Sequence, residues 1–317
     1  MPVPPIPLHE GTAWLPDGRL LGYAEFGVPD GDVVLWFPGT PGARKQLPPA
    51  TPEEAIERNL RVICIERPGT GISTPYVYDS VLDYAADIAD FADVLGIERF
   101  GVAGLSGGGP YTLACAYAMP DRVVGAAVLG GIGPTRGPDT CPGYTRLLAP
   151  FSPVLALTKG PLAFIFNTVV PPLKLVGPRA FDLYAKVAPK CDRPLLNEPD
   201  FKAMFVQDLS DALDHGIRAP VMDIYLFSRD WGFSLQDIRI PVRFWHGDAD
   251  RIVPVSHGLH QSDLVPQGHL SIVPGGGHFS GFETVPVVLD VFHDLFSAES
   301  SGSGGNGAAP SAAGVAT

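Results

Sequence analysis

The stretch GVAGLSGGGPYTLACA, residues 101–116, places one serine among five glycines, between an apolar run and a segment of small residues. Gly104, Ser106 and Gly108 fit the pattern G-x-S-x-G at a predicted strand-to-helix junction. On such a turn the serine takes a strained backbone conformation, and larger residues at the flanking glycine positions would clash with it. The turn lifts the hydroxyl above a sheet and directs the N-terminus of the next helix towards the reaction centre. The stretch therefore predicts a nucleophilic serine.

A glycine-rich phosphate loop or an ordinary turn is the alternative interpretation of the same stretch. No lysine follows Ser106 as a P-loop requires, and the spacing is not G-x-G-x-x-G. The position of the motif, after an apolar strand and before the helix-like segment 110–120, favours the nucleophile.

Short apolar segments recur along the chain and alternate with helix-length segments. One such helix is expected over 80–96, with Ser80 capping its start and Gly96 ending it. Continuous apolar strands that alternate with helices indicate a parallel sheet buried on both faces. Residues 12–26 alternate around a Pro-Asp-Gly turn and predict an antiparallel hairpin. The other expected strands are 33–37, 61–65, 100–104, 123–130, 241–247 and 269–275, and a last helix is expected near 283–297.

The strand rhythm disappears between residues 134 and 235, where proline-broken, helix-like segments replace it. We predict a helical cap insertion there, between a first core part, 1–133, and a second core part, 236–297. An ordinary helical layer of the core is the alternative. The tail 298–317 is rich in Gly, Ser and Ala, which predicts disorder.

The composition excludes several classes of function. Acidic residues outnumber basic ones by 34 to 22, so the formal net charge of −12 argues against nucleic acid as a partner. The first residues lack the pattern of a signal peptide, and no stretch has the uninterrupted apolar length of a membrane span. The four cysteines lie far apart, which indicates neither a zinc site nor a disulfide framework and favours a cytoplasmic location. No pattern indicates the oligomeric state.

A serine needs a base, oriented by an acid, to act as a nucleophile. On a sheet of this kind the acid and then the histidine follow the serine along the chain. His278 lies on a glycine-rich loop after the strand 269–275 and is the expected base. The loop after the strand 241–247 supplies two carboxylates, of which we favour Asp250, with Asp248 as a turn former.

The chain resembles the large capped branch of the α/β hydrolases, which includes esterases, epoxide hydrolases, haloalkane dehalogenases and aminopeptidases. The resemblance covers about residues 12–297. It implies an α/β fold in which helices flank a mostly parallel sheet and a helical cap is inserted. The family's G-x-x-D-x-x-V-P pattern implies Asp250 as the acid, and its final Gly-His implies His278 as the base. The motifs that carry it are LWFPGTPGAR (35–44), ERPGTGIST (66–74), GLSGGGPYTLACAYAMPDRV (104–123), WHGDADRIVP (245–254) and GGGHF (275–279).

One departure from the family pattern concerns the loop after the third strand. The family usually has His-Gly there, and this chain has Pro38-Gly39. The resemblance implies an oxyanion hole made by the backbone amides of Thr40 and Gly107. Since backbone groups make these contacts, the loss of the histidine need not abolish them.

The identity of residue 106 narrows the reaction. Epoxide hydrolases and dehalogenases of this fold use an aspartate nucleophile, so Ser106 excludes both. We expect hydrolysis of a carboxylic ester or thioester of a small, largely apolar substrate through an acyl-enzyme, with no metal or organic cofactor. The candidate substrate-binding residues are Leu105, Phe164, Trp231 and Phe279. Packing within the protein is the alternative for the cap residue Phe164, and a buried hinge contact is the alternative for Trp231.

Three other functions remain open. An aminopeptidase would use the acidic run 192–214 to hold a free amine, although such runs usually lie on a solvated face. The same three residues would also suit hydrolysis of a carbon–carbon bond. A receptor-like member of the fold would bind a small ligand and hydrolyse it weakly, and only the departure at Pro38 favours this alternative.

Overall fold

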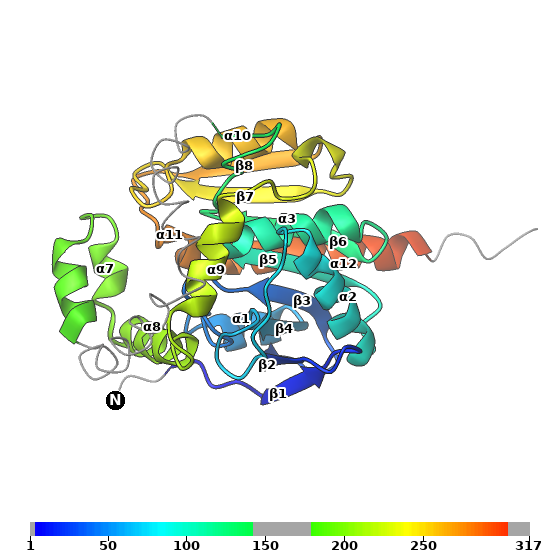
Figure 1. The fold of residues 1–317 in the computed structure, drawn as a ribbon, viewed down its shortest axis with the longest axis horizontal. Helices are drawn as coiled ribbons and strands as arrows, with labels where there is room; N and C mark the ends of the chain where they lie inside the picture. The colour runs from blue at the N-terminus through cyan, green and yellow to red at the C-terminus, as the bar shows by residue number, and fades with distance from the viewer. Residues whose placement is uncertain (1–3, 142–178, 304–317) are drawn as a thin grey trace, which may run out of the picture.

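A central sheet organises the computed structural model, which describes residues 4–141 and 179–303. In these residues eight strands lie in the order β1-β2-β4-β3-β5-β6-β7-β8 (Figure 1). The pairs β1–β2 and β2–β4 are antiparallel, and the other neighbours are parallel. The mostly parallel sheet that the sequence predicts is confirmed. The strands are β1 (His9–Trp14), β2 (Leu20–Gly27), β3 (Asp32–Phe37), β4 (Leu60–Ile65), β5 (Phe100–Leu105), β6 (Val123–Leu129), β7 (Val242–Gly247) and β8 (Gly268–Val273).

Helices cover both faces of the sheet, because alternate residues of each central strand point to opposite sides. In β3, Leu35 and Phe37 join the core cluster under α2 (Asp83–Val94) and α3 (Gly109–Ala118). Val34 and Trp36 join the cluster on the other face. That face is covered by α1 (Thr51–Glu57) and α12 (Val285–Ser303), while α10 (Ser256–Leu264) packs on β7 and β8. Short helices over Ser106–Gly108, Leu235–Asp237 and Ser280–Glu283 (α11) complete the core.

The six predicted strands beyond the hairpin match β3 to β8 to within two residues. The predicted cap of the helix over 80–96 is wrong, because α2 begins at Asp83 and Ser80 does not cap it. The Asp83 carboxylate instead accepts hydrogen bonds from the backbone N–H groups of Asp79 and Ser80, both at 2.9 Å. The end of the helix is as predicted, since Gly96 follows it with φ +68°.

The C-terminal helix is longer than the sequence predicts. Disorder was expected from residue 298, whereas α12 continues to Ser303. Ala298 and Glu299 favour helix, and Arg99 forms an ion pair with Glu299 that attaches this last part to the core. Residues 304–317 of the predicted tail lie outside the described residues.

The stretch between β6 and β7, where the sequence predicts the insertion, is irregular over 130–141 and largely helical over 179–227. It contains a helix over 179–187, α7 (Arg193–Leu196), α8 (Pro199–Ala212) and α9 (Arg218–Phe227). Figure 1 shows α7 and α8 to the left of the sheet. Both α8 and α9 contact the loop that follows β3, so they lie at the carboxyl ends of the parallel strands. Residues 142–178 of the predicted cap lie outside the described residues, and the exact cap boundaries stay a prediction.

Within the described ranges, no helix combines the length and the apolar character that crossing a membrane requires.

Candidate active site

Ser106 occupies a sharp turn between β5 and α3. Its φ of +51° lies in the left-handed region, which costs an L-residue roughly 1–2 kcal/mol. A Cβ atom on Gly108 would lie 2.1 Å from the backbone oxygen of Phe37, and one on Gly104 would lie 2.6 Å from the carbonyl carbon of Gly108. Both flanking positions therefore require glycine, for the steric reason that the motif suggests.

The structure brings together the three residues that the sequence suggests, which follow one another along the chain as Ser106, Asp250 and His278. The Nε2 atom of His278 lies 3.0 Å from Ser106 Oγ, and its Nδ1 atom lies 2.7 Å from Asp250 Oδ2. Three different strand ends supply these side chains: Ser106 follows β5, Asp250 follows β7 and His278 follows β8. His278 Nε2 can therefore accept the proton of the Ser106 hydroxyl while the Asp250 carboxylate holds Nδ1.

The two candidate acids occupy different environments. The Asp250 side chain is fully buried, and its Oδ1 atom accepts hydrogen bonds from the backbone N–H groups of Ile252, at 2.8 Å, and Val253, at 2.9 Å. Asp248 is exposed and accepts a hydrogen bond of 2.8 Å from the backbone N–H of Gly275, which braces the loop. The carboxylate that reaches His278 is therefore that of Asp250.

The charge of Asp250 is strongly stabilised. Burial raises the pKa of this carboxyl, but the nearby His246 ring, the bond to His278 and the Val253 N–H outweigh burial and hold the pKa far below its usual range. His246 Nε2 lies 2.8 Å from the carbonyl oxygen of Val253 and 3.5 Å from Asp250 Oδ2, so its N–H points mainly at the carbonyl. A permanent anion beside Nδ1 favours a proton on that nitrogen and leaves Nε2 to accept one.

The two candidate oxyanion donors lie side by side. A Cβ atom on Gly107 would lie 3.2 Å from Thr40 N and 2.3 Å from Thr40 Oγ1, so the loop after β3 contacts the residue that follows Ser106. The N–H of Gly39 donates a 2.6 Å hydrogen bond to Gln46 Oε1. The Thr40 N–H therefore lies close enough to Gly107 to be a candidate second donor, although Pro38 replaces the usual histidine.

The candidate substrate-binding residues separate into different environments. Phe279 is buried beside His278, with ring centroids 5.8 Å apart, and it also packs on Phe201 and Phe205 of α8. Leu105 is buried directly before Ser106. Trp231 is 2 % exposed, lies in the main core cluster and packs on Phe233, which favours the buried hinge contact over a place in the pocket wall. Phe164 lies outside the described residues.

Two aspartates of the acidic run 192–214 are buried and bind backbone, which the sequence did not predict. Asp192 accepts a 3.0 Å hydrogen bond from the N–H of Phe279, next to His278. Asp208, on α8, accepts hydrogen bonds of 3.0 Å from the N–H groups of Ala43 and Lys45. Burial raises the pKa of Asp208 to about 7 in spite of these bonds. No spacing in the sequence distinguishes these two carboxylates from their solvated neighbours.

His257, on α10, is a buried histidine outside the Ser106 cluster. Its Nδ1 atom accepts a 2.9 Å hydrogen bond from the N–H of Gly133, where the chain leaves β6. Burial, helped by the nearby His246 and His260, lowers the pKa of His257 from 6.5 to about 4. This histidine is therefore neutral in the folded protein at pH values where it is charged in the unfolded chain.

Acidification is expected to destabilise the wild type more than the variant His257→Asn, whose amide oxygen can still accept from Gly133. Between pH 6.5 and 4 the unfolded state binds a proton at residue 257 that the native state does not bind. The wild type therefore loses up to about 3 kcal/mol of unfolding free energy across this window. Urea unfolding at several pH values tests this, with the exposed His269→Asn as control. Parallel pH profiles for wild type and His257→Asn would contradict the prediction.

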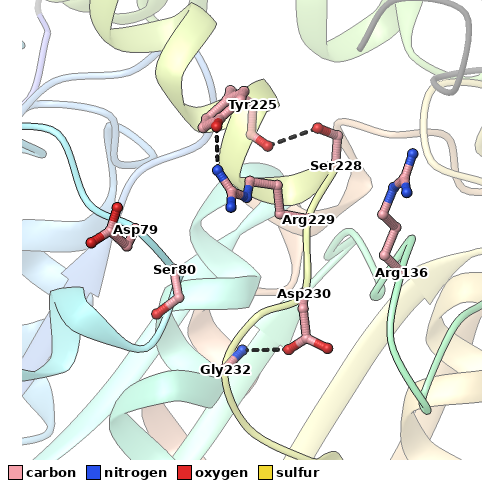
Figure 2. Close-up of a pocket in the computed structure, with 8 residues that line it drawn as sticks. All are labelled: Asp79, Ser80, Arg136, Tyr225, Ser228, Arg229, Asp230 and Gly232. Atoms are coloured by element: carbon pink, nitrogen blue, oxygen red, sulfur yellow. Dashed lines mark hydrogen bonds between the residues drawn. The ribbon is translucent and has the colours of Figure 1, made fainter. Parts of the chain in front are cut away.

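A cavity of about 480 Å³ lies where the predicted insertion leaves the core and returns to it (Figure 2). Arg136 lines it on the outgoing side, and residues from the end of α9 line it on the returning side. Figure 2 shows Arg229 beside the hydroxyl of Tyr225, and the Asp230 carboxylate on the N–H of Gly232. Arg229 and Asp230 therefore have partners within the lining of the cavity. In the described part of the chain, no three His, Cys, Asp or Glu side chains gather as a metal site would require.

A comparison with protein families defines the class of this chain. The model of the alpha/beta hydrolase family matches residues 33–289, which is more than half of the chain. The chain therefore belongs to the alpha/beta hydrolase family, as its motifs and its sheet suggest.

Curated relatives of the chain include enzymes with different substrates. A proline iminopeptidase of Neisseria meningitidis is 34 % identical over 130 residues, which are 39 % of this chain and 40 % of that protein. The chain thus matches only about two fifths of the length of these relatives. A 2-hydroxy-6-oxo-2,4-heptadienoate hydrolase of Pseudomonas putida is 24 % identical over 273 residues, covering 84 % of this chain and 89 % of that protein.

Solved structures share the fold at low sequence identity. A bromoperoxidase from Bacillus anthracis superposes with a TM-score of 0.67 at 17 % identity, over 91 % of this chain and 100 % of that chain. A thermophilic esterase from Thermogutta terrifontis superposes with a TM-score of 0.64 at 18 % identity, over 92 % of this chain and 98 % of that chain. These similarities concern the fold alone.

Proposed function

We propose that this chain is a serine hydrolase that cleaves a carboxylic ester or thioester of a small, largely apolar substrate. The observation that carries the proposal is the continuous contact from Ser106 Oγ to His278 Nε2, at 3.0 Å, and from His278 Nδ1 to Asp250 Oδ2, at 2.7 Å. A hydroxyl, an imidazole and a buried carboxylate in this order form the arrangement that activates a serine for acyl transfer.

In the proposed mechanism, Ser106 Oγ attacks the substrate carbonyl carbon while His278 Nε2 accepts the hydroxyl proton. Asp250 holds the imidazole and stabilises the positive charge that it acquires. The N–H groups of Thr40 and Gly107 donate to the oxygen of the tetrahedral intermediate. His278 then returns the proton to the leaving alkoxide or thiolate, and the acyl group stays on Ser106. Water, deprotonated by His278, then attacks this ester, and His278 returns the proton to Ser106 Oγ as the acid is released.

The apolar surroundings of His278 favour an apolar acyl group. Phe279, Phe201 and Phe205 form an aromatic cluster between the histidine loop and α8. Asp208 binds backbone N–H groups with both carboxylate oxygens, and Asp192 binds the Phe279 N–H with Oδ1, so both of these candidates for holding a substrate amine already bind backbone. Both features favour an ester over a substrate with a free amine. The cytoplasmic location expected from the cysteines stays a prediction.

Peptide hydrolysis is the second candidate, because the proline iminopeptidase matches at 34 % identity over 130 residues. Carbon–carbon bond hydrolysis is the third, because the Pseudomonas putida hydrolase matches over 84 % of the chain. All three reactions pass through the same serine. They are distinguished by a panel of p-nitrophenyl esters of rising chain length, proline p-nitroanilide and a vinylogous 1,5-diketone. We expect the esters to be turned over fastest.

The proposal is tested first with a fluorophosphonate probe and intact mass. The wild type is expected to gain one adduct, which Ser106→Ala abolishes and His278→Ala slows strongly, because the probe reacts with an activated serine. Ser228→Ala removes a buried serine hydroxyl at the cavity of Figure 2 and is the matched control, with labelling like the wild type. A folded wild type without an adduct would refute the proposal and favour a receptor-like, ligand-binding role.

A further inference from the structure

The loop that follows β3 carries the candidate oxyanion donor Thr40, and side chains hold it. Arg67 comes two residues after β4 and is 3 % exposed. Its guanidinium donates hydrogen bonds to the carbonyl oxygens of Pro38, at 2.6 Å, and Gly39, at 2.5 Å. It also donates to the hydroxyl of Thr40, at 3.0 Å. One rigid fork of donors thus holds three consecutive residues of the loop.

These contacts fix the direction of the Thr40 N–H. The carbonyl of Gly39 and the N–H of Thr40 belong to one planar peptide unit and point in opposite directions. Holding the Gly39 oxygen towards Arg67 therefore turns the Thr40 N–H away from Arg67. The preceding peptide unit is held at both ends, because Arg67 binds the Pro38 carbonyl and Gln46 Oε1 accepts from the Gly39 N–H.

Asp223, on α9 of the predicted cap, completes the assembly. Its carboxylate accepts hydrogen bonds from Arg67 Nε at 2.8 Å, the Thr40 hydroxyl at 2.7 Å and the Tyr111 hydroxyl at 2.8 Å. The carboxylate is buried and balances the buried guanidinium. Tyr111 lies on α3, the helix that begins after Ser106. The assembly thus joins the loop, the nucleophile's helix and the cap.

We propose that Arg67 and Asp223 are positioning residues that aim the Thr40 N–H at the substrate oxyanion. The inference rests on the proposed function. The guanidinium lies on the carbonyl side of the loop, so it acts through the peptide unit and does not itself bind the oxyanion. The assembly orients the Thr40 N–H on a loop in which Pro38 replaces the family's usual histidine. It also makes the geometry of the oxyanion hole depend on a helix of the insertion.

The variant Arg67→Lys tests the inference with the least disturbance of the fold. Lysine keeps the positive charge opposite Asp223 but lacks the planar fork that reaches two carbonyls at once. We expect kcat for the best p-nitrophenyl ester to fall about 10²-fold with KM changed less than about threefold, since the loss resembles that of one oxyanion donor. Thr40→Val is expected to lower kcat about 10-fold, and Thr40→Ser, which keeps the hydroxyl, to restore most of it.

A tetrahedral inhibitor separates positioning from a general structural defect. A trifluoromethyl ketone with the same acyl chain forms an oxyanion on Ser106, so its Ki should rise by the same factor as kcat/KM falls. Arg44→Lys is the matched control, because Arg44 is a mostly buried arginine whose ion pairs run to Glu10 and Glu66. It should leave kcat and Ki within about twofold of the wild type while making the same chemical change.

Two results would overturn the inference. Folded Arg67→Lys with wild-type kcat and Ki would show that the loop holds its shape without the fork. If kcat fell in both Arg67→Lys and Arg44→Lys, and in each by an amount that follows the drop in its melting temperature, the role of Arg67 would be purely structural. These results differ from failure of the proposed function, in which the wild type itself would form no fluorophosphonate adduct and would hydrolyse no ester.

Discussion

Alanine at Ser106 or at His278 is expected to lower kcat by about 10⁴- to 10⁶-fold, measured on the ester that the wild type hydrolyses fastest. Ser106→Ala removes the attacking oxygen, and His278→Ala removes the group that lies 3.0 Å from it and takes its proton. Because the two act as one unit, the double variant should be no slower than either single variant by more than a few-fold. Losses that multiply in the double variant would argue against the proposed unit.

The acid is tested by a matched pair of variants two residues apart. Asp250→Asn keeps the shape of the side chain but removes the anion beside His278 Nδ1, and kcat should fall about 10⁴-fold. Asp248→Asn makes the same change on an exposed carboxylate that binds the N–H of Gly275, and it should change kcat less than about 10-fold. The opposite ranking would assign the acid to Asp248. Circular dichroism of both variants establishes that they are folded.

The largest effect on stability is expected from Gly108→Ala. The added methyl carbon would lie 2.1 Å from the Phe37 oxygen and 2.9 Å from the Pro38 oxygen, so backbone must move to admit it. We expect a loss of about 3 kcal/mol or more in unfolding free energy, together with lost activity, because the displaced segment leads to Thr40. Chemical denaturation followed by tryptophan fluorescence measures the loss.

A second glycine separates this clash from backbone strain. Gly18, in the β1–β2 turn, has φ +84° and open space around the position of its absent Cβ. Gly18→Ala should therefore cost only about 1–2 kcal/mol, which is the cost of the left-handed conformation alone. If Gly108→Ala were no more costly than Gly18→Ala, the turn at Ser106 would be looser than its contacts indicate.

The sequence predicts the fold well because local patterns determine it. Apolar runs such as 33–37 and 100–104 locate β3 and β5, since a strand buried on both faces has no polar alternation. The ends of helices are predicted less accurately, because more than one nearby side chain can bind the backbone there. Ser80 is a candidate cap of α2 in the sequence, whereas in the structure Leu82 precedes the helix and the Asp83 carboxylate binds the N–H groups of Asp79 and Ser80. The continuation of α12 to Ser303 lets Glu299 form a surface ion pair with Arg99, 200 residues away in the chain.

The candidate site was accessible to prediction where a short motif encloses the residue. Ser106, Asp250 and His278 each stand in such a motif after a strand, and the structure places Ser106 and Asp250 each within hydrogen-bonding reach of His278. The residues that hold the site in place could not be predicted from the sequence. Asp223 reaches Thr40 across 183 residues, and it is a lone acid in the apolar stretch PVMDIYLF, residues 220–227. Tertiary contacts of this kind depend on how α9 is placed, which spacing along the chain does not encode.

The buried aspartates also define which part of the chain can be exchanged between hydrolases. Asp192, Asp208 and Asp223 bind the segments that carry His278 and Thr40, although all three lie in the region where sequence alone draws a separate cap. A chimaera that replaces residues 192–223 would leave the N–H groups of Phe279, Ala43 and Lys45 without their acceptors. For recombination, the core of this chain therefore includes the second half of the predicted insertion, and a donor sequence is best joined before Asp192.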